Sequence, residues 1–206
     1  MAVLLGGGER KRDQDDAGCL VVSCLRRELG GRGTLALDAR DGSVDWHYEA
    51  DGPVSASPTV HDGVVYAGIN GGGSLVAPSS ATGGPRWEYD TVGSITGSSP
   101  AVANGTVFVG DHGEAGSRLH AVDQENGDNV WSQRSRGPIR ASPAVVDGVV
   151  YVTDLDDTVC GLNTADGAEI WRFETGDNVR SSPALWRGRL FVGSDDGYVY
   201  ALRDSG

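Results

Sequence analysis

A short phrase recurs four times in this chain at a nearly constant spacing. Residues 55–67 read SASPTVHDGVVYA, and residues 140–152 read RASPAVVDGVVYV. Two looser copies, at 98–110 and 181–193, keep the Ser-Pro pair, the glycine and the aromatic residue. A fixed period of this kind indicates a stack of similar units, each of which buries its apolar faces only against the next unit.

Tryptophans repeat with the same period as the Ser-Pro pairs. They lie 40 to 44 residues apart, and each has a glycine four residues before it. The four are Trp46, Trp87, Trp131 and Trp171. The two ladders together divide the chain into units near 33–53, 54–92, 93–136, 137–176 and 177–206.

Each unit reads as four short strands. In the fourth unit, apolar runs on both sides of Asp147-Gly148 predict a hairpin, and the segments 158–163 and 169–174 predict a third and a fourth strand. No run in the repeats has the 3.6-residue apolar period of a helix. The sequence therefore predicts an all-β fold, a β-propeller of four-stranded antiparallel blades in which each tryptophan wedges into the neighbouring sheet.

These motifs carry a family resemblance. The segment VCGLNTADGAEIWRFETG (159–176), begun again as VYALRDSG from residue 199, resembles the pyrroloquinoline-quinone-like (PQQ-like) β-propeller repeat. The resemblance covers 33–206, about four PQQ-like repeats, and so implies a partial or small propeller. The family includes quinoprotein alcohol dehydrogenases, scaffolds for outer-membrane-protein assembly, and extracellular sensor domains of kinases.

The resemblance implies a non-catalytic binding or scaffold module for a protein or small ligand, at the cell surface or outside the cell. The alternative is a fragment or relative of a PQQ-dependent quinoprotein alcohol dehydrogenase. Those enzymes hold the quinone against a pair of adjacent cysteines inside an eight-bladed funnel. This chain has no Cys-Cys pair and about half of the blades, so no PQQ cofactor and no catalytic residue is expected.

Arg140 and Arg180 are the candidate binding residues. Each stands three residues before the proline of its Ser-Pro pair, where Ser55 and Gly97 stand in other units. The position leads into the innermost strand, which in a propeller lines the central channel. Two guanidiniums there could clamp a carboxylate or a phosphate. The alternative is that they pair with neighbouring loop acids.

Acidic turns suggest a weaker metal hypothesis. Asp154, Asp156 and Asp157 approximate an oxygen-rich calcium motif, but Asp and Gly are also what tight turns require, so turn chemistry explains them without a metal. His120 and Cys160 occupy the same place in the third strand, where other units have Val76 and Tyr200. That variation indicates packing between blades.

The charge excludes some partners. The chain has 29 acidic and 17 basic residues and a net charge of −12, which disfavours nucleic acid and anionic membranes as partners. Such a surface resembles those of proteins from salt-accumulating halophiles.

The ends are less regular. Residues 1–32 match no unit, and they are interpreted as a loosely ordered segment without a visible signal peptide or membrane span. The stretch VVSC before residue 25 resembles a lipoprotein box, but acids replace the basic residues expected upstream, so no lipid is expected. The cellular location stays open.

How the ring closes is also open. The first unit holds strands three and four and the last holds strands one to three, which favours pairing of the two ends in one blade. A small closed ring, an open arc whose homodimer completes an eight-bladed ring, and a piece of a longer protein all remain. GTLALD (33–38) has one residue fewer between its glycine and its alanine than GYVYAL (197–202) has, which predicts a flipped strand alternation at the N-terminal end.

Overall fold

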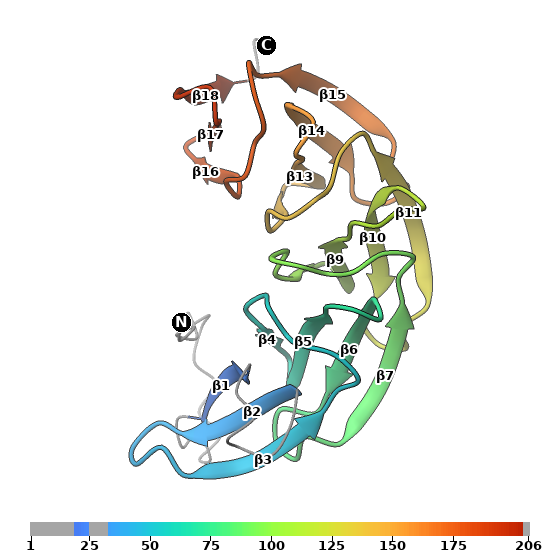
Figure 1. The fold of residues 1–206 in the computed structure, drawn as a ribbon, viewed down its shortest axis with the longest axis vertical. Helices are drawn as coiled ribbons and strands as arrows, with labels where there is room; N and C mark the ends of the chain where they lie inside the picture. The colour runs from blue at the N-terminus through green and yellow to red at the C-terminus, as the bar shows by residue number, and fades with distance from the viewer. Residues whose placement is uncertain (1–18, 25–32, 204–206) are drawn as a thin grey trace.

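The structure is a computed structural model that describes residues 19–24 and 33–203, with side chains for residues 33–203. The described residues contain no helix and form five antiparallel sheets. Figure 1 shows these sheets side by side in an open arc, with a gap between the first and the fifth. The predicted fold class, an all-β partial propeller, is confirmed.

Three of the sheets are complete, with four strands each. The second sheet contains β4 (Thr59–His61), β5 (Val64–Ile69), β6 (Ser74–Pro78) and β7 (Pro85–Asp90). The third contains β8 (Ala101–Ala103), β9 (Thr106–Gly110), β10 (Ser117–Asp123) and β11 (Asn129–Ser135). The fourth contains β12 (Ala144–Val146), β13 (Val149–Thr153), β14 (Thr158–Asn163) and β15 (Glu169–Glu174).

The two terminal sheets have three described strands each. The first contains β1 (Cys19–Cys24), β2 (Gly33–Asp38) and β3 (Val44–Glu49). The fifth contains β16 (Ala184–Trp186), β17 (Arg189–Gly193) and β18 (Val199–Arg203). Strands β7, β11 and β15 run along the convex side of the arc (Figure 1).

The predicted hairpins form at the predicted turns. Between β12 and β13, Asp147 and Gly148 have φ angles of 50° and 78°. Two consecutive positive φ angles define the type I′ turn, whose twist matches that of antiparallel strands. The same left-handed pair recurs at Asp62-Gly63, Asn104-Gly105 and Arg187-Gly188.

A row of three side chains crosses each complete sheet. In the second sheet Tyr66 pairs with Thr59, and Ala77 lies opposite Trp87, with the rings of Tyr66 and Trp87 5.7 Å apart. The small central residue lets the two rings meet above it. The same row recurs as Phe108, Ala121 and Trp131, and as Tyr151, Gly161 and Trp171.

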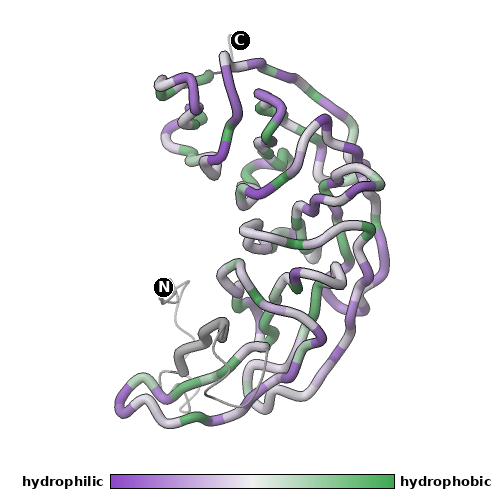
Figure 2. Tube along the Cα trace, in the orientation of Figure 1, coloured by the Kyte–Doolittle hydropathy of each residue, from purple (hydrophilic) through white to green (hydrophobic). Residues whose placement is uncertain are grey.

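We call the face with the tryptophan the leading face, because it packs on the opposite, trailing face of the next sheet. Trp46 packs with Val65 of the second sheet, and Trp131 packs with Val150 of the fourth. The indole nitrogens reach the same neighbours: Trp46 Nε1 donates to the carbonyl of Ser80 at 2.8 Å, and Trp131 Nε1 to that of Thr164 at 2.9 Å. Figure 2 shows the hydrophobic residues concentrated in the inner strands.

Hydrogen bonds between Ser-Pro serines tie the inner segments together. The N–H of Ser57 donates to Oγ of Ser99, Ser99 N–H to Ser142 Oγ and Ser142 N–H to Ser182 Oγ, at 3.1, 2.9 and 3.0 Å. We call this the serine ladder. It joins the second, third, fourth and fifth units in the same way and explains why the Ser-Pro pair repeats with the period.

The first sheet corrects one prediction. Ala36 lies opposite Trp46 and the bulge follows directly, as at Ala77 and Trp87 in the next unit, so the alternation is not flipped. β2 begins at Gly33 itself, so the residue that is missing relative to GYVYAL falls before the strand and not within it. The prediction of a flipped strand was therefore wrong.

The ends are not complementary either. β2 and β18 are both third strands, because Ala36 and Ala201 hold the same place in their sheets, and β1 pairs with β2 where a second strand would lie. A single blade cannot accept two third strands. The prediction that the two ends pair in one blade was wrong, and the described residues form an open arc.

Candidate binding site at the inner rim

The segments ahead of β12 and β16 place the two predicted arginines. Ile139 N–H donates to the carbonyl of Asp111 at 3.3 Å, and Val179 N–H to that of Asp154 at 3.1 Å. These bonds fix each segment against the preceding unit just before its arginine. Arg140 and Arg180 follow, and both side chains are exposed.

Arg180 is engaged by a loop acid. Its Nε lies 2.7 Å from Oδ2 of Asp195, and both side chains are more than one-third exposed. This is the alternative that the sequence left open, and such an exposed pair contributes little to stability. The structure shows no contact between Arg180 and Arg140.

Arg140 has a different environment. No described acid forms an ion pair with it, and its neighbour His112 has a pKa lowered by burial and, to a lesser extent, by the charge of Arg140. His112 Nε2 and Thr96 Oγ1 are both buried without a hydrogen-bond partner. We call Thr96, His112 and Arg140 the inner-rim patch.

The inner-rim patch suits an anionic group. A guanidinium without an acid partner supplies charge and several N–H donors, and a hydroxyl and a ring nitrogen supply further polar atoms. Unsatisfied buried polar atoms in a native fold call for an explanation such as a bound ion or water. Sequence reasoning found Arg140 but missed Thr96 and His112, which lie in the loops of the preceding unit.

The three candidate metal ligands are turn residues in the structure. Asp154 is buried, and its Oδ1 accepts from the N–H groups of Asp156 and Thr158, while Oδ2 accepts from Ser135 Oγ at 2.6 Å. Asp157 has a φ of 59°, and burial, followed by the nearby carboxylates, raises its pKa. Within residues 33–203 no group of three His, Cys, Asp or Glu side chains is placed to hold a metal ion.

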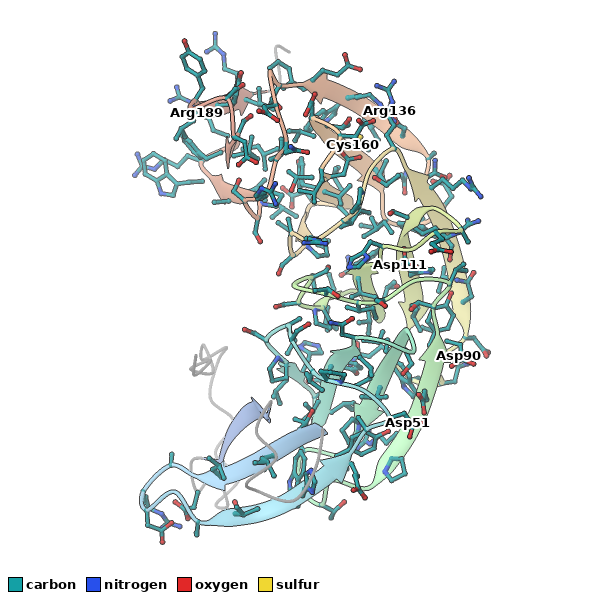
Figure 3. All side chains as sticks on the ribbon, in the orientation of Figure 1. Asp51, Asp90, Asp111, Arg136, Cys160 and Arg189 are labelled. Atoms are coloured by element: carbon teal, nitrogen blue, oxygen red, sulfur yellow. The ribbon has the colours of Figure 1, made fainter. Side chains whose placement is uncertain are left out.

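Asp111 plays the same structural role in the preceding unit. It accepts from the N–H groups of Gly93 and Arg118, at 2.9 and 2.6 Å, and its Oδ2 lies 3.0 Å from His120 Nε2. The other ring nitrogen of His120 contacts Ser132 Oγ at 2.9 Å and Tyr89 OH at 3.1 Å. Figure 3 shows Asp111 inside the arc. The sequence predicted a packed His120 but not this network.

Cys160 lies in a small cleft between the third and fourth sheets. Burial raises the pKa of its thiol to about 12, so the thiolate is not formed at neutral pH. Gln133 and Cys160 face each other here, where the neighbouring junctions hold the larger pairs Tyr89 with His120 and Phe173 with Tyr200. The cleft therefore follows from smaller side chains. In residues 19–24 and 33–203 no helix has the length and apolar character that a membrane crossing needs.

Comparison with known proteins gives consistent results. The model of a family described as outer membrane protein assembly factor BamB matches residues 16–114 and 71–206. The chain is 32% identical over 186 residues to the outer membrane protein assembly factor BamB of Yersinia pestis, covering 83% of this chain and 46% of that protein. It is 29% identical to the quinohemoprotein alcohol dehydrogenase ADH IIB of Pseudomonas putida, covering 73% of this chain and 24% of the enzyme.

Solved structures show the same fold. The crystal structure of BamB from Moraxella catarrhalis matches with a TM-score of 0.75 and 23% identity, covering 92% of this chain and 59% of that one. The chain thus spans about half the length of the curated assembly factors it matches.

Proposed function

Because the chain belongs to the PQQ-like propeller family described as outer membrane protein assembly factor BamB, we propose that it is a non-catalytic scaffold module that binds a protein partner in the cell envelope. The similarity to proteins named for outer membrane protein assembly supports the class of role and the location. The single observation that supports a place for the contact is Arg140, an exposed cation that no described acid pairs.

The inner-rim patch would hold an acidic group of the partner. Arg140 would form a charge-assisted hydrogen bond with a carboxylate, and Thr96 and His112 would provide the polar surroundings. Arg180 provides a matched control, because it occupies the same place in the next unit but pairs with Asp195.

A titration with acetate and with inorganic phosphate, followed by the NMR signals of His112, tests the patch. Wild type and an Arg180→Ala variant should show the same saturable shift, and an Arg140→Ala variant should lose it. Equal shifts in all three proteins would rule out Arg140 as the anion ligand.

Photo-crosslinking in isolated cell envelopes tests the protein partner. Benzoylphenylalanine in place of Ser55, on the inner rim, should give an adduct with one protein that an Arg140→Glu change weakens. The same group in place of Asp128, in the turn between β10 and the outer strand β11, should not. Equal adducts at both positions, or none at Ser55, would contradict a partner at the inner rim.

The second candidate is a relative of the quinoprotein alcohol dehydrogenases, favoured by the match to the Pseudomonas putida enzyme. Reconstitution with the quinone and calcium, followed by dye reduction, tests it. Turnover above the protein-free blank would favour the enzyme over the scaffold.

A further inference from the structure

Backbone contacts hold His112 beside the other two residues of the inner-rim patch. Its N–H donates to the carbonyl of Ser94 at 3.0 Å, and its carbonyl accepts from Ser94 N–H at 2.8 Å, two residues before Thr96. The carbonyl of the residue before His112 accepts from Ile139 N–H, next to Arg140, at 3.3 Å. His112 is therefore fixed between the segment that carries Thr96 and the segment that carries Arg140.

Gly97 brings these two segments into contact. The third unit has one residue more between its isoleucine and its proline (ITGSSP, 95–100) than the fourth unit has (IRASP, 139–143). Within this longer segment Gly97 has a φ of 85°, and an added Cβ there would lie 2.9 Å from the carbonyl oxygen of Arg140. The three residues of the patch, from two neighbouring units, thus form one small site.

Few charges act on the ring of His112. Burial lowers the pKa of this imidazole, the charge of Arg140 lowers it further, and Asp111 raises it by less. The segment 91–100, which packs on His112, contains no titratable side chain, and Glu114 in its own connection is exposed. Because the usual pKa of about 6.5 is lowered here, the ring is neutral at neutral pH when no ligand is bound.

The neutral ring leaves one nitrogen unsatisfied. Nε2 of His112 is buried, as is Oγ1 of Thr96, and neither atom has a hydrogen-bond partner. A neutral imidazole carries one N–H, whereas an imidazolium carries two. Protonation therefore makes Nε2 a donor whichever tautomer the neutral ring adopts.

An anion bound to Arg140 reverses the electrostatics at this ring. Its negative charge offsets the field of the guanidinium and favours the imidazolium, so it raises the pKa of His112. Coupling between two bound species is reciprocal, so a proton on His112 strengthens the binding of the anion by the same factor.

We propose that the inner-rim patch binds an anionic group together with one proton on His112, so that it holds its acidic partner more tightly in mildly acidic than in neutral solution. Arg140 supplies the permanent charge, and Nε2 of the protonated His112 donates a second hydrogen bond to the same group. This inference deepens the binding role proposed above and rests on it.

Sulfate serves as the probe, since its charge does not change between about pH 5.5 and about pH 7.5. The full chain is titrated at both pH values and at constant ionic strength, and binding is followed by the backbone amide NMR signals of residues 139–141. The dissociation constant should be about three- to tenfold smaller at the lower pH, because one unit of pKa shift corresponds to a tenfold change. The ring signals of His112 should report a higher pKa in saturating sulfate than without it.

Two histidine variants separate this coupling from the general loss of negative charge on acidification. His112→Gln removes the titrating ring and should abolish most of the dependence on pH. His61→Gln removes an exposed histidine at the end of β4 and should keep the dependence of wild type. Melting temperatures check that both variants fold, and the pKa measured on the wild-type ring needs no variant.

The outcomes distinguish this inference from the proposed function. Saturable sulfate binding that requires Arg140 but has the same affinity at both pH values would overturn the coupling and leave the binding site in place. An equal dependence on pH in His112→Gln, or a His112 pKa that sulfate does not raise, would also overturn it. Absence of saturable binding to wild type at both pH values would overturn the anion site itself.

Discussion

Turn glycines have two separate roles, which a pair of variants can separate. Gly127 and Gly105 have φ angles of 80° and 76°, so an alanine strains the backbone equally at both. At Gly127 the added Cβ would also lie 2.8 Å from the indole of Trp87, whereas at Gly105 nothing lies within 4 Å.

We therefore expect Gly105→Ala to lower the free energy of unfolding by about 1 kcal/mol, and Gly127→Ala to lower it by about 1 to 3 kcal/mol more, through overpacking against the indole. Urea unfolding followed by tryptophan fluorescence measures both. Equal losses would mean that the indole moves aside freely.

His112 links stability to pH. Burial and the charge of Arg140 lower its pKa, so the folded chain binds fewer protons than the unfolded chain near pH 6.5. Its contribution is full above the unfolded pKa and is lost as pH falls through that value, levelling off below the folded pKa. His112→Gln should therefore reduce the fall in melting temperature between about pH 7.5 and about pH 5.5. An unchanged fall would contradict this linkage.

The candidate residues show how far sequence reasoning reaches at this scale. Repeat position was enough to predict that Arg140 and Arg180 lie at equivalent inner places. It could not show that Arg180 alone is paired with an acid. That acid, Asp195, comes from the β17–β18 turn, and no repeat spacing connects this turn to Arg180. The contact between Asp111 and His120 was hidden for the same reason, since Asp111 lies in the connection after β9 and His120 lies in β10.

Contacts between neighbouring sheets stabilise the fold, and the tryptophans take part in these contacts. Trp131 is 9% exposed, packs on the fourth sheet and donates a hydrogen bond to the Thr164 carbonyl. Trp131→Ala should lower the free energy of unfolding by about 3 to 5 kcal/mol, and Trp131→Phe should lose less. Chemical denaturation measures the difference. A loss under about 1 kcal/mol would mean that the indole is not a core residue.

The inner segments show compensating sizes between sheets. Ile139 packs on Gly110, where an added Cβ would lie 2.1 Å from the isoleucine. One unit later the equivalent positions hold a smaller residue, Val179, and a larger one, Thr153. Gly110→Thr should cost about 1 to 3 kcal/mol, and adding Ile139→Val should restore some of it. A double-mutant cycle measures this coupling. Strict additivity would show that the two positions are independent.

Element types were predictable because each hairpin carries its own turn dipeptide next to alternating apolar residues. The pairing of β1 was not, since no turn or tryptophan marks residues 19–24. The bulge beside each tryptophan also escaped prediction. It places one extra residue in a strand without any signature residue.

At the scale of the whole molecule, charge predicts a dependence on salt. A net charge of −12 opposes compaction in dilute buffer, and at about 1 M salt the screening length falls to roughly 3 Å. The melting temperature should rise steadily with potassium chloride, and sodium chloride should act alike. A flat response would contradict the halophile interpretation, which stays a prediction, as does the homodimer.

The overall shape was only partly predicted. The repeat indicated blades and their number, but whether the arc closes depends on strand order at the ends. Reading β2 as a partner for the last blade overlooked that β18 already fills the third place. The division of residues 1–32 from the repeats stays a prediction, although the segment contributes β1 to the first sheet.

The serine ladder has a consequence for descent. Since the three junctions from the second sheet to the fifth are joined by the same donor and the same acceptor, a gene that gains or loses one whole unit there by recombination recreates a junction already present. A lineage can therefore change the number of its blades in single genetic events, without an intermediate whose blades fail to dock.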